Sequence, residues 1–290
     1  MRVALIGAGR MGSAMGSRVA GAGHDLVVFN RTRSRAAALA EQIGVQVADN
    51  ARDAAASAEV CLVSLADDAA VTATYLDDSG LIGGLQPGAV VCDTSTVAPA
   101  TIGGLAPLVA QQGAKLIDTP VSGSVSTVES GTLTVMVGGD QEALERARPV
   151  LDAFAKSIFH LGDVGAGATM KLVVNALVAA LNVAVSEALV LAERAGLDRQ
   201  TVYDVFEASA AGAPYVKYKR EAFLRPGEVP VAFSLALTAK DSELIHDLAQ
   251  RIGARMDQGE ASRRLVAEAV AAGLAERDIS EVAEFLRRPL

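Results

Sequence analysis

A lysine and an asparagine stand four positions apart in a stretch whose composition predicts a long helix. On a helix, Lys171 and Asn175 lie on one face, one turn from each other, where both can hold the same small molecule. An ammonium group shifts its pKa readily when it is desolvated, so Lys171 could pass a proton to or from an oxygen atom. The alternative is a lysine that merely extends from an apolar helix to water.

A glycine-rich loop follows the first apolar run of the chain and opens a helical stretch. A strand, this loop and a helix in succession are the context in which a GxGxxG motif binds a dinucleotide. Its glycines let the backbone approach a pyrophosphate, and the helix N-terminus offers N–H groups and its positive dipole end. An ordinary tight turn between strand and helix gives the same pattern, but the second strand that follows favours cofactor binding. The loop residues are Gly7, Ala8, Gly9, Arg10, Met11 and Gly12.

The second strand ends in Asn30, Arg31 and Thr32, where NAD-specific sites place a carboxylate on the ribose 2′-hydroxyl. A carboxylate would repel a 2′-phosphate, whereas Arg31 can pair with it and Thr32 can donate a hydroxyl. NADP(H) is therefore preferred. NAD(H) is possible, because arginines also stack on adenine in NAD enzymes, and a solvated surface turn is the plain alternative.

Three further loops follow apolar runs at the ends where parallel sheets bind ligands. Ser122, Gly123 and Ser124 offer hydroxyls and closely spaced N–H groups suited to a carboxylate, although a polar turn has the same composition. Thr96 follows the run at 89–94, where a helix N-cap is the alternative. Leu65 ends the run at 60–65 and is expected to contact the cofactor through backbone atoms.

Four separated segments together carry a resemblance to a known family: 5–15 (LIGAGRMGSAM), 118–123 (DTPVSG), 165–175 (GAGATMKLVVN) and 240–241 (KD). They resemble the β-hydroxyacid dehydrogenases, which include 3-hydroxyisobutyrate dehydrogenase-like and 6-phosphogluconate dehydrogenase-like enzymes and the tartronate-semialdehyde, glyoxylate and succinic-semialdehyde reductases. The chain departs from the family pattern at Ala8, Arg18, Ser124 and Val174.

This resemblance implies an oxidoreductase that transfers a hydride between the nicotinamide cofactor and a small β-hydroxyacid or aldehyde acid. Lys171 would be the general acid in carbonyl reduction and the general base in alcohol oxidation, with Asn175 orienting the same oxygen. Thr96 would lie beside the nicotinamide. Lys240 would place positive charge near the cofactor or the substrate carboxylate, and Asp241 would orient neighbouring groups. Phe233 is expected to line the substrate pocket.

The order of elements predicts an α/β protein with two domains. Over 1–162, short apolar runs alternate with Ala-rich helical stretches, which is typical of a Rossmann-type doubly wound sheet that binds the cofactor. Over 163–290, we expect an all-α domain for substrate and oligomerisation, beginning with a long helix at 168–196. The expected strands are 3–7, 26–30, 60–65, 89–94 and 115–120, with 132–139 and 157–162 extending the sheet in mixed direction.

The composition of the chain indicates which binding partners to expect. The net charge of −8 comes with no basic block, so nucleic acid is not expected. No run reaches the ~20 apolar residues that span a bilayer, so a soluble, cytoplasmic protein is expected. Cys61 and Cys92 lack metal-binding spacing and should be buried thiols, and no metal site is expected. The apolar long helix predicts a homodimer or homotetramer.

Two other functions fit part of the pattern. Imine reductases resemble this family in architecture but generally lack the lysine and the carboxylate-binding loop. A cofactor-binding module without turnover would keep the fold and lose the lysine. Lys171 together with DTPVSG at 118–123 favours the hydroxyacid enzyme over both.

Overall fold

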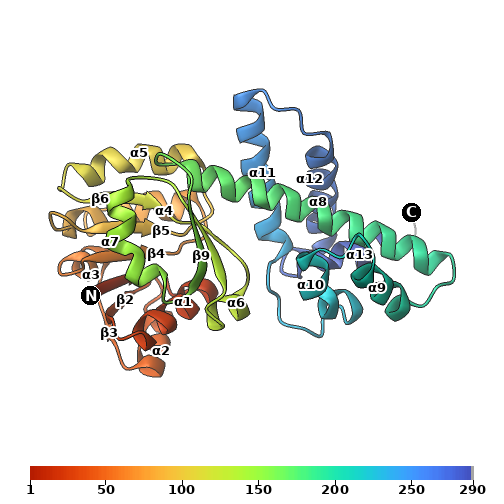
Figure 1. The fold of residues 1–290 in the computed structure, drawn as a ribbon, viewed down its shortest axis with the longest axis horizontal. Coiled ribbons are helices and arrows are strands. Elements are labelled where there is room, and N and C mark those ends of the chain that lie inside the picture. The colour runs from red at the N-terminus through yellow and green to blue at the C-terminus, as the bar shows by residue number, and fades with distance from the viewer. Residues whose placement is uncertain (289–290) are drawn as a thin grey trace. The chain divides into compact units, whose positions relative to one another are not determined.

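The chain packs into two compact units. Contacts between residues group Met1–Lys171 into the first unit and Leu172–Leu290 into the second. The computed structural model shown in Figure 1 describes residues 1–288. Each unit has a hydrophobic core of its own.

A six-stranded parallel sheet forms the centre of the first unit, in the order β3-β2-β1-β4-β5-β6. The expected apolar runs form strands because both faces are covered: every residue of β4 and β5 is buried. Cys61 and Cys92 lie in these two strands, both free, and burial raises the pKa of Cys61 to about 12. The strands are β1 (Arg2–Ile6), β2 (Asp25–Phe29), β3 (Gln46–Val47), β4 (Val60–Val63), β5 (Val90–Asp93) and β6 (Lys115–Asp118).

Helices cover both faces of this sheet, and alternate strand residues point to opposite cores. Leu5, Leu62 and Cys92 pack in one cluster with residues of α1, α2 and α7. Their neighbours Ala4 and Cys61 pack in the other cluster with α3, α4 and α5. This confirms the doubly wound sheet. The helices are α1 (Arg10–Gly21), α2 (Arg33–Ile43), α3 (Ala51–Ala55), α4 (Asp68–Leu76), the 3₁₀ turn η1 (Leu81–Gly84), α5 (Pro99–Ala110), α6 (Val125–Glu129) and α7 (Gln141–Leu151).

A second, three-stranded sheet completes the first unit. It holds β7 (Val121–Ser122), β8 (Leu133–Val137) and β9 (Ala155–His160), with β7 antiparallel and β9 parallel to β8. The expectation that these strands extend the main sheet is wrong, although the mixed direction is confirmed. The two sheets meet at a bridge between Asp118 and Gly138, because the chain turns from β6 into β7 within two residues.

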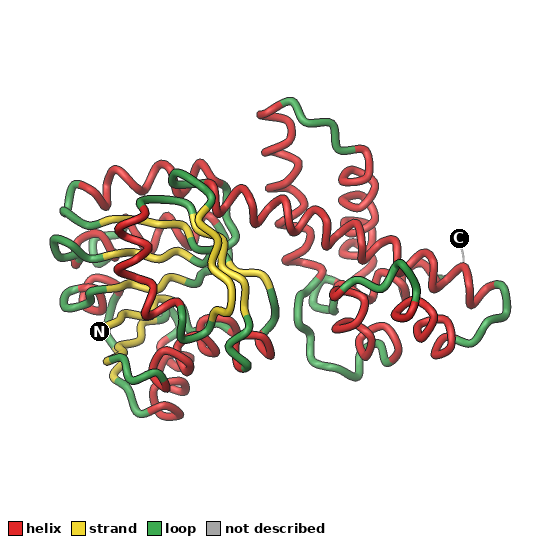
Figure 2. The backbone as a smooth tube through the Cα atoms, viewed as in Figure 1, coloured by secondary structure: helices red, strands yellow, loops and turns green. Residues whose placement is uncertain are grey.

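The second unit consists of helices and loops over the described residues 172–288, with one isolated bridge (Figure 2). This confirms the all-α prediction for the C-terminal part. The helices are α8 (Ala166–Arg194), α9 (Arg199–Ala208), α10 (Pro214–Leu224), α11 (Leu235–Ile252), α12 (Asp257–Ala269), the π-helical turn η2 (Val270–Leu274), the 3₁₀ turn η3 (Ile279–Glu281) and α13 (Val282–Arg287).

Helix α8 begins two residues before the predicted start and ends two residues before the predicted end. Among the described residues it is the one helix long and apolar enough to cross a membrane, so the expectation that no such stretch exists is wrong on length and composition. Within the second unit, however, α8 buries polar groups: Asn182 donates to the carbonyl of Ile279 over 2.9 Å and accepts from the Tyr215 hydroxyl over 2.7 Å. Such bonds are typical of a helix in a protein core.

A buried ion pair ties α10 to the start of η3, and backbone bonds to the same carboxylate add the segment that precedes α11. Both carboxylate oxygens of Asp278 accept from Lys219 Nζ, at 2.6 and 2.8 Å, and both residues are at most 5% exposed. Asp278 also accepts from the N–H groups of Ala232 and Phe233. Burial alone would raise the pKa of Asp278, but Lys219 and the N–H donors hold that pKa below its usual value. The pair therefore fixes the chain around Phe233.

Candidate functional site

The glycine loop has the backbone geometry that a dinucleotide site needs. Gly7 directly follows β1 and has φ at +105°, and a Cβ there would lie 2.2 Å from the Ser64 carbonyl oxygen. A Cβ on Gly12 would lie 2.0 Å from the carbonyl oxygen of Gly7, so α1 packs directly on the loop. At Gly9, the N-cap of α1, no atom of the described chain lies within 4 Å of such a Cβ. A phosphate can therefore approach the helix N-terminus at this point, and the loop fits a pyrophosphate.

Asn30 joins the loop to the end of β2. Its Oδ1 accepts from the Ala8 N–H over 3.0 Å, and its Nδ2 donates to the Thr32 carbonyl over 2.9 Å. Asn30 therefore holds Ala8 against the segment 30–32. Arg31 and Thr32 follow with exposed side chains, and Thr32 is the N-cap residue of α2.

A buried carboxylate that sequence reasoning missed organises the next two loops. Asp93, at the end of β5, accepts from the Tyr75 hydroxyl over 2.9 Å and from the Ser95 N–H over 2.8 Å. The Ser95 hydroxyl in turn accepts from the Leu65 N–H over 3.0 Å. Burial raises the pKa of Asp93, while these donors oppose that rise. The network places Leu65 and half-buried Thr96 at the same end of neighbouring strands, and the acidic ending of the buried run at 89–94 was its only signal.

Ser122, Gly123 and Ser124 lie where β7 turns into α6. Gly123 has φ at +141°, and a Cβ there would lie 2.2 Å from Thr127 Oγ1, so this position requires glycine. Ser124 has φ at −122°, which any residue adopts, so serine fits where the family more often has glycine. Its N–H donates to Thr127 Oγ1 over 2.8 Å and caps α6. That N–H is therefore engaged, and Ser122 and Gly123 are better placed to contact an acid.

Lys171 lies in the second turn of α8, half-buried, and is the last residue of the first unit. The same unit contains the glycine loop, Leu65, Thr96 and the loop at 122–124. The predicted cofactor loops, the predicted carboxylate loop and Lys171 thus belong to one compact body, whereas Asn175 and Lys240 belong to the second unit.

The second unit holds Asn175, Lys240 and Asp241 together. Asn175 Nδ2 donates to Asp241 Oδ2 over 2.6 Å, and Lys240 Nζ lies 2.9 Å from Asp241 Oδ1. Asn175 and Asp241 are 8% and 4% exposed, so this group is largely out of water. Phe233 lies seven positions before Lys240, and its carbonyl accepts from the Ile279 N–H. The packing thus brings Asn175 to the KD pair and holds Phe233 near the start of α11.

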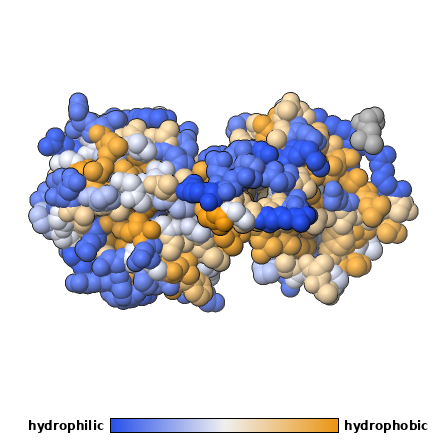
Figure 3. Space-filling model, turned by 90° about the horizontal axis from the view of Figure 1, so that it is seen from above, coloured by the Kyte–Doolittle hydropathy of each residue, from blue (hydrophilic) through white to orange (hydrophobic). Residues whose placement is uncertain are grey.

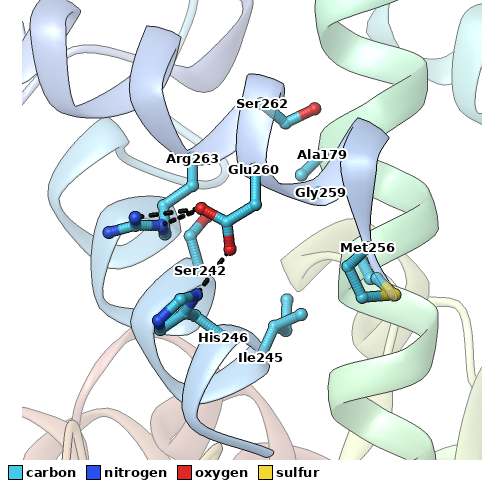
Figure 4. A pocket seen from close by; sticks show the side chains of 10 residues that line it. Ala179, Ser242, Ile245, His246, Met256, Gly259, Glu260, Ser262 and Arg263 are labelled. Carbon is cyan, nitrogen blue, oxygen red and sulfur yellow. Dashed lines mark hydrogen bonds and ion pairs between the residues drawn. The ribbon is translucent and has the colours of Figure 1, made fainter. Parts of the chain in front are cut away.

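A small cavity in the second unit holds none of the predicted residues. It lies among α8, α11 and α12, where His246 Nδ1 and Glu260 are 2.5 Å apart and Arg263 donates to the same carboxylate (Figure 4). Its volume of about 20 Å³ holds roughly one water molecule. This cavity is too small for a hydroxyacid.

Two family models together match almost the whole chain. Residues 2–162 match the NAD binding domain of 6-phosphogluconate dehydrogenase. Residues 165–286 match the model described as NAD-binding of NADP-dependent 3-hydroxyisobutyrate dehydrogenase. Each model covers one of the two segments, 1–162 and 163–290, for which the sequence predicts different elements.

Named relatives agree with these models. The chain is 34% identical to an NAD-dependent L-serine dehydrogenase of Pseudomonas aeruginosa, over 97% of this chain and 96% of that protein. It is 32% identical to the chloroplastic glyoxylate/succinic semialdehyde reductase 2 of Arabidopsis thaliana, over 98% and 79%. A solved structure of Mycobacterium tuberculosis 3-hydroxyisobutyrate dehydrogenase with L-serine is 33% identical, covers 99% of this chain and 100% of that one, and superposes with a TM-score of 0.86.

The fold and the glycine loop define a nicotinamide-dependent oxidoreductase. The chain belongs to the β-hydroxyacid dehydrogenase family, as its sequence motifs predict. It is an NAD(P)-dependent dehydrogenase that acts on the CH–OH group of small hydroxyacids.

Replacing Gly12 tests the cofactor loop. Gly12→Ala places a methyl group 2.0 Å from the Gly7 carbonyl, so the loop must move, and we expect cofactor affinity to fall by ~10-fold or more, about 1.4 kcal/mol. Titration of nicotinamide fluorescence measures it. Gly21→Ala is the matched control, since it lies in the same helix with no atom within 4 Å of the new methyl group. Equal affinities in the two variants would contradict the assignment.

Proposed function

We propose that this protein interconverts a small β-hydroxyacid and its carbonyl acid with NADP(H) as preferred cofactor, and that Lys171 is the general acid and base. The observation that carries this proposal is the pairing of Lys171 with Asn175 one turn away on α8, with the Asn175 amide fixed by Asp241 over 2.6 Å. We assign cofactor binding to residues 1–162 and substrate binding to 163–290, and we assign the loop at 122–124 to the substrate carboxylate.

The protein's own contribution to the reaction is the transfer of a proton to or from the substrate oxygen. When bound, the nicotinamide supplies or accepts the hydride. In carbonyl reduction Lys171 donates a proton to the substrate oxygen, and in alcohol oxidation it removes that proton. Because Asn175 Nδ2 donates to Asp241, its amide has one orientation, which lets it hold the same oxygen in a fixed position.

The substrate carboxylate has named candidates. Ser122 offers its hydroxyl and Gly123 its N–H, while Ser124 sets the shape of the loop by capping α6. Lys240 offers positive charge to the carboxylate or the cofactor, with Asp241 holding its ammonium at 2.9 Å. Phe233 is assigned to the apolar lining of the substrate site.

The preference for NADP(H) is argued from the end of β2. Positions 30–33 contain no carboxylate. Both the oxygen and the nitrogen of the Asn30 amide are hydrogen-bonded to the backbone, at Ala8 and Thr32. Arg31 therefore remains for the 2′-phosphate, with Thr32 beside it. We assign Arg10 and Met11, in the first turn of α1, to the pyrophosphate side, and Leu65 and Thr96 to the nicotinamide side.

Imine reduction is the competing activity on this architecture. Lys171 and the carboxylate-binding loop favour an acid substrate, because an imine needs neither a carboxylate grip nor the lysine that the family uses for hydroxyacids. A non-catalytic cofactor-binding module would have no use for the fixed Asn175 amide.

Self-association is proposed from the surface of α8. Within the second unit this helix exposes large aliphatic side chains at Val173, Leu177 and Leu191, which are 53%, 62% and 72% exposed. Figure 3 shows apolar surface interspersed with hydrophilic residues on the visible face of the molecule. Burying such a stripe against a second copy would remove it from water. We propose a homodimer or homotetramer that works in the cytoplasm.

A substrate panel tests the function directly. We expect the purified protein to oxidise NADPH with glyoxylate or succinic semialdehyde, or to reduce NADP⁺ with 3-hydroxyisobutyrate or L-serine, and to turn over cyclic imines poorly. Absorbance of the reduced nicotinamide measures each rate. Lys171→Ala should lower kcat by ~10² or more, whereas Lys156→Ala, an exposed lysine of β9, should leave it unchanged. Turnover of imines alone would contradict the hydroxyacid assignment.

Assays with NADPH and with NADH test the cofactor preference. Arg31→Ala should weaken NADPH by ~10-fold and leave NADH nearly unchanged, since only NADPH carries the 2′-phosphate. Arg35→Ala, four residues further along the chain at an exposed position of α2, is the matched control. A wild-type preference for NADH, or equal effects of both variants, would overturn the NADP assignment.

Light scattering during size-exclusion chromatography tests self-association. We expect the mass of a dimer or a tetramer of the 29.7 kDa chain, and Leu177→Glu should shift the protein toward the monomer because it places a charge in the exposed stripe. A monomeric wild type at micromolar concentration would rule out the homo-oligomer.

A further inference from the structure

The N-terminus of α8 is held by one buried side chain, that of Asp118. Its Oδ1 accepts from the Gly165 N–H and its Oδ2 from the Ala168 N–H, each over 2.7 Å. Asp118 is 1% exposed, at the end of β6. The first N–H groups of a helix have no partner within the helix, and a carboxylate both accepts from them and faces the positive end of the helix dipole. The helix is thereby bound to the end of a strand.

The two glycines that pack against this carboxylate, Gly138 and Gly167, leave no space for a side chain. A Cβ on Gly167 would lie 2.5 Å from the Met136 carbonyl and 2.8 Å from Asp118 Oδ2, and a Cβ on Gly138 would lie 2.7 Å from Asp118 Oδ1. The Asp118 backbone is fixed as well, since it exchanges two hydrogen bonds with Gly138, at 3.0 and 2.9 Å. Burial raises the pKa of Asp118, and the N–H groups of Gly165 and Ala168 oppose that rise.

Asp118 connects two parts of the proposed chemistry. Lys171 follows Ala168 by three residues, less than one turn of α8. Ser122 follows Asp118 by four residues and is fixed in β7 by pairing with Thr134. A shift of Asp118 would therefore move the proton donor relative to the loop assigned to the carboxylate. We infer that Asp118 is a positioning residue, which sets the place of the Lys171 ammonium in the reaction without touching substrate.

This inference rests on the proposed role of Lys171, and two variants test it. Asp118→Asn keeps the size but turns one acceptor into an amide N–H that faces another N–H. Gly167→Ala leaves the carboxylate intact and pushes on it, so it decides the question if Asp118→Asn does not accumulate as folded protein. The matched control is Asp140→Asn, which changes the exposed N-cap of α7, a helix with no assigned site residue.

Steady-state kinetics with NADPH and the best carbonyl acid of the panel give the first readout. Both Asp118→Asn and Gly167→Ala should lower kcat by ~10²-fold, as expected for a misplacement of about 1 Å, with the Kd for NADPH within about 2-fold of wild type. The pH limb of kcat that disappears in Lys171→Ala should disappear or move in both variants. The Asp140→Asn variant should keep kcat and the pH profile of the wild type.

Hydrogen exchange gives a readout independent of turnover, because the Ala168 amide should exchange faster in Asp118→Asn than in wild type. Wild-type kcat and pH profile in Asp118→Asn or Gly167→Ala, or equal losses in Asp140→Asn, would overturn the inference. Unchanged turnover in Lys171→Ala would instead refute the proposed function.

Discussion

The hydrogen bonds between the Asp118 carboxylate and the N-terminus of α8 are the constraint on which the position of Lys171 depends. A 29-residue helix is a stiff rod, so fixing its first turn fixes the direction of every side chain in the next turn. Two hydrogen bonds of 2.7 Å that N–H groups donate to a buried carboxylate are stronger than bonds between neutral groups. Because Gly138 and Gly167 close around it, the carboxylate has little room to move. The position of Lys171, in the next turn of α8, is therefore set by these contacts.

A second aspartate occupies the same level of the sheet. Asp93 and Asp118 are paired in register at the ends of β5 and β6. The first holds Ser95 and, through it, Leu65, where the cofactor is proposed to lie. The second holds α8. Parallel strands end together, so one edge of the sheet carries both supports, and the loops that follow them are fixed before any ligand binds. Burial raises the pKa of both carboxylates, and N–H or O–H donors oppose that rise in both.

Local pattern was sufficient for the elements and insufficient for their side-chain partners. Five strands of the main sheet and α8 follow from apolar runs and from helical composition, and the glycine loop follows from its spacing. The two-residue strand β3 was not predicted, because neither of its residues is buried. The hydrogen bonds that Asp118 accepts join residues 47 and 50 positions apart, and hydrophobic periodicity does not indicate such pairs. The same holds for Tyr75 with Asp93 and for Lys219 with Asp278. The separate sheet at β7–β9 was missed because two residues between β6 and β7 suffice to change sheets.

The acid/base role of Lys171 is tested most directly by chemical rescue of Lys171→Ala with small primary amines. If Lys171 supplies the proton, methylamine and ethylamine should restore turnover of the carbonyl acid in a saturable way, with a rate that follows the pKa of the amine. The Asn175→Ala variant should gain nothing from the same amines, since its lysine is intact. Failure of every amine to raise the rate of folded Lys171→Ala that still binds NADPH, or equal rescue of Asn175→Ala, would contradict the role of Lys171 as the proton donor.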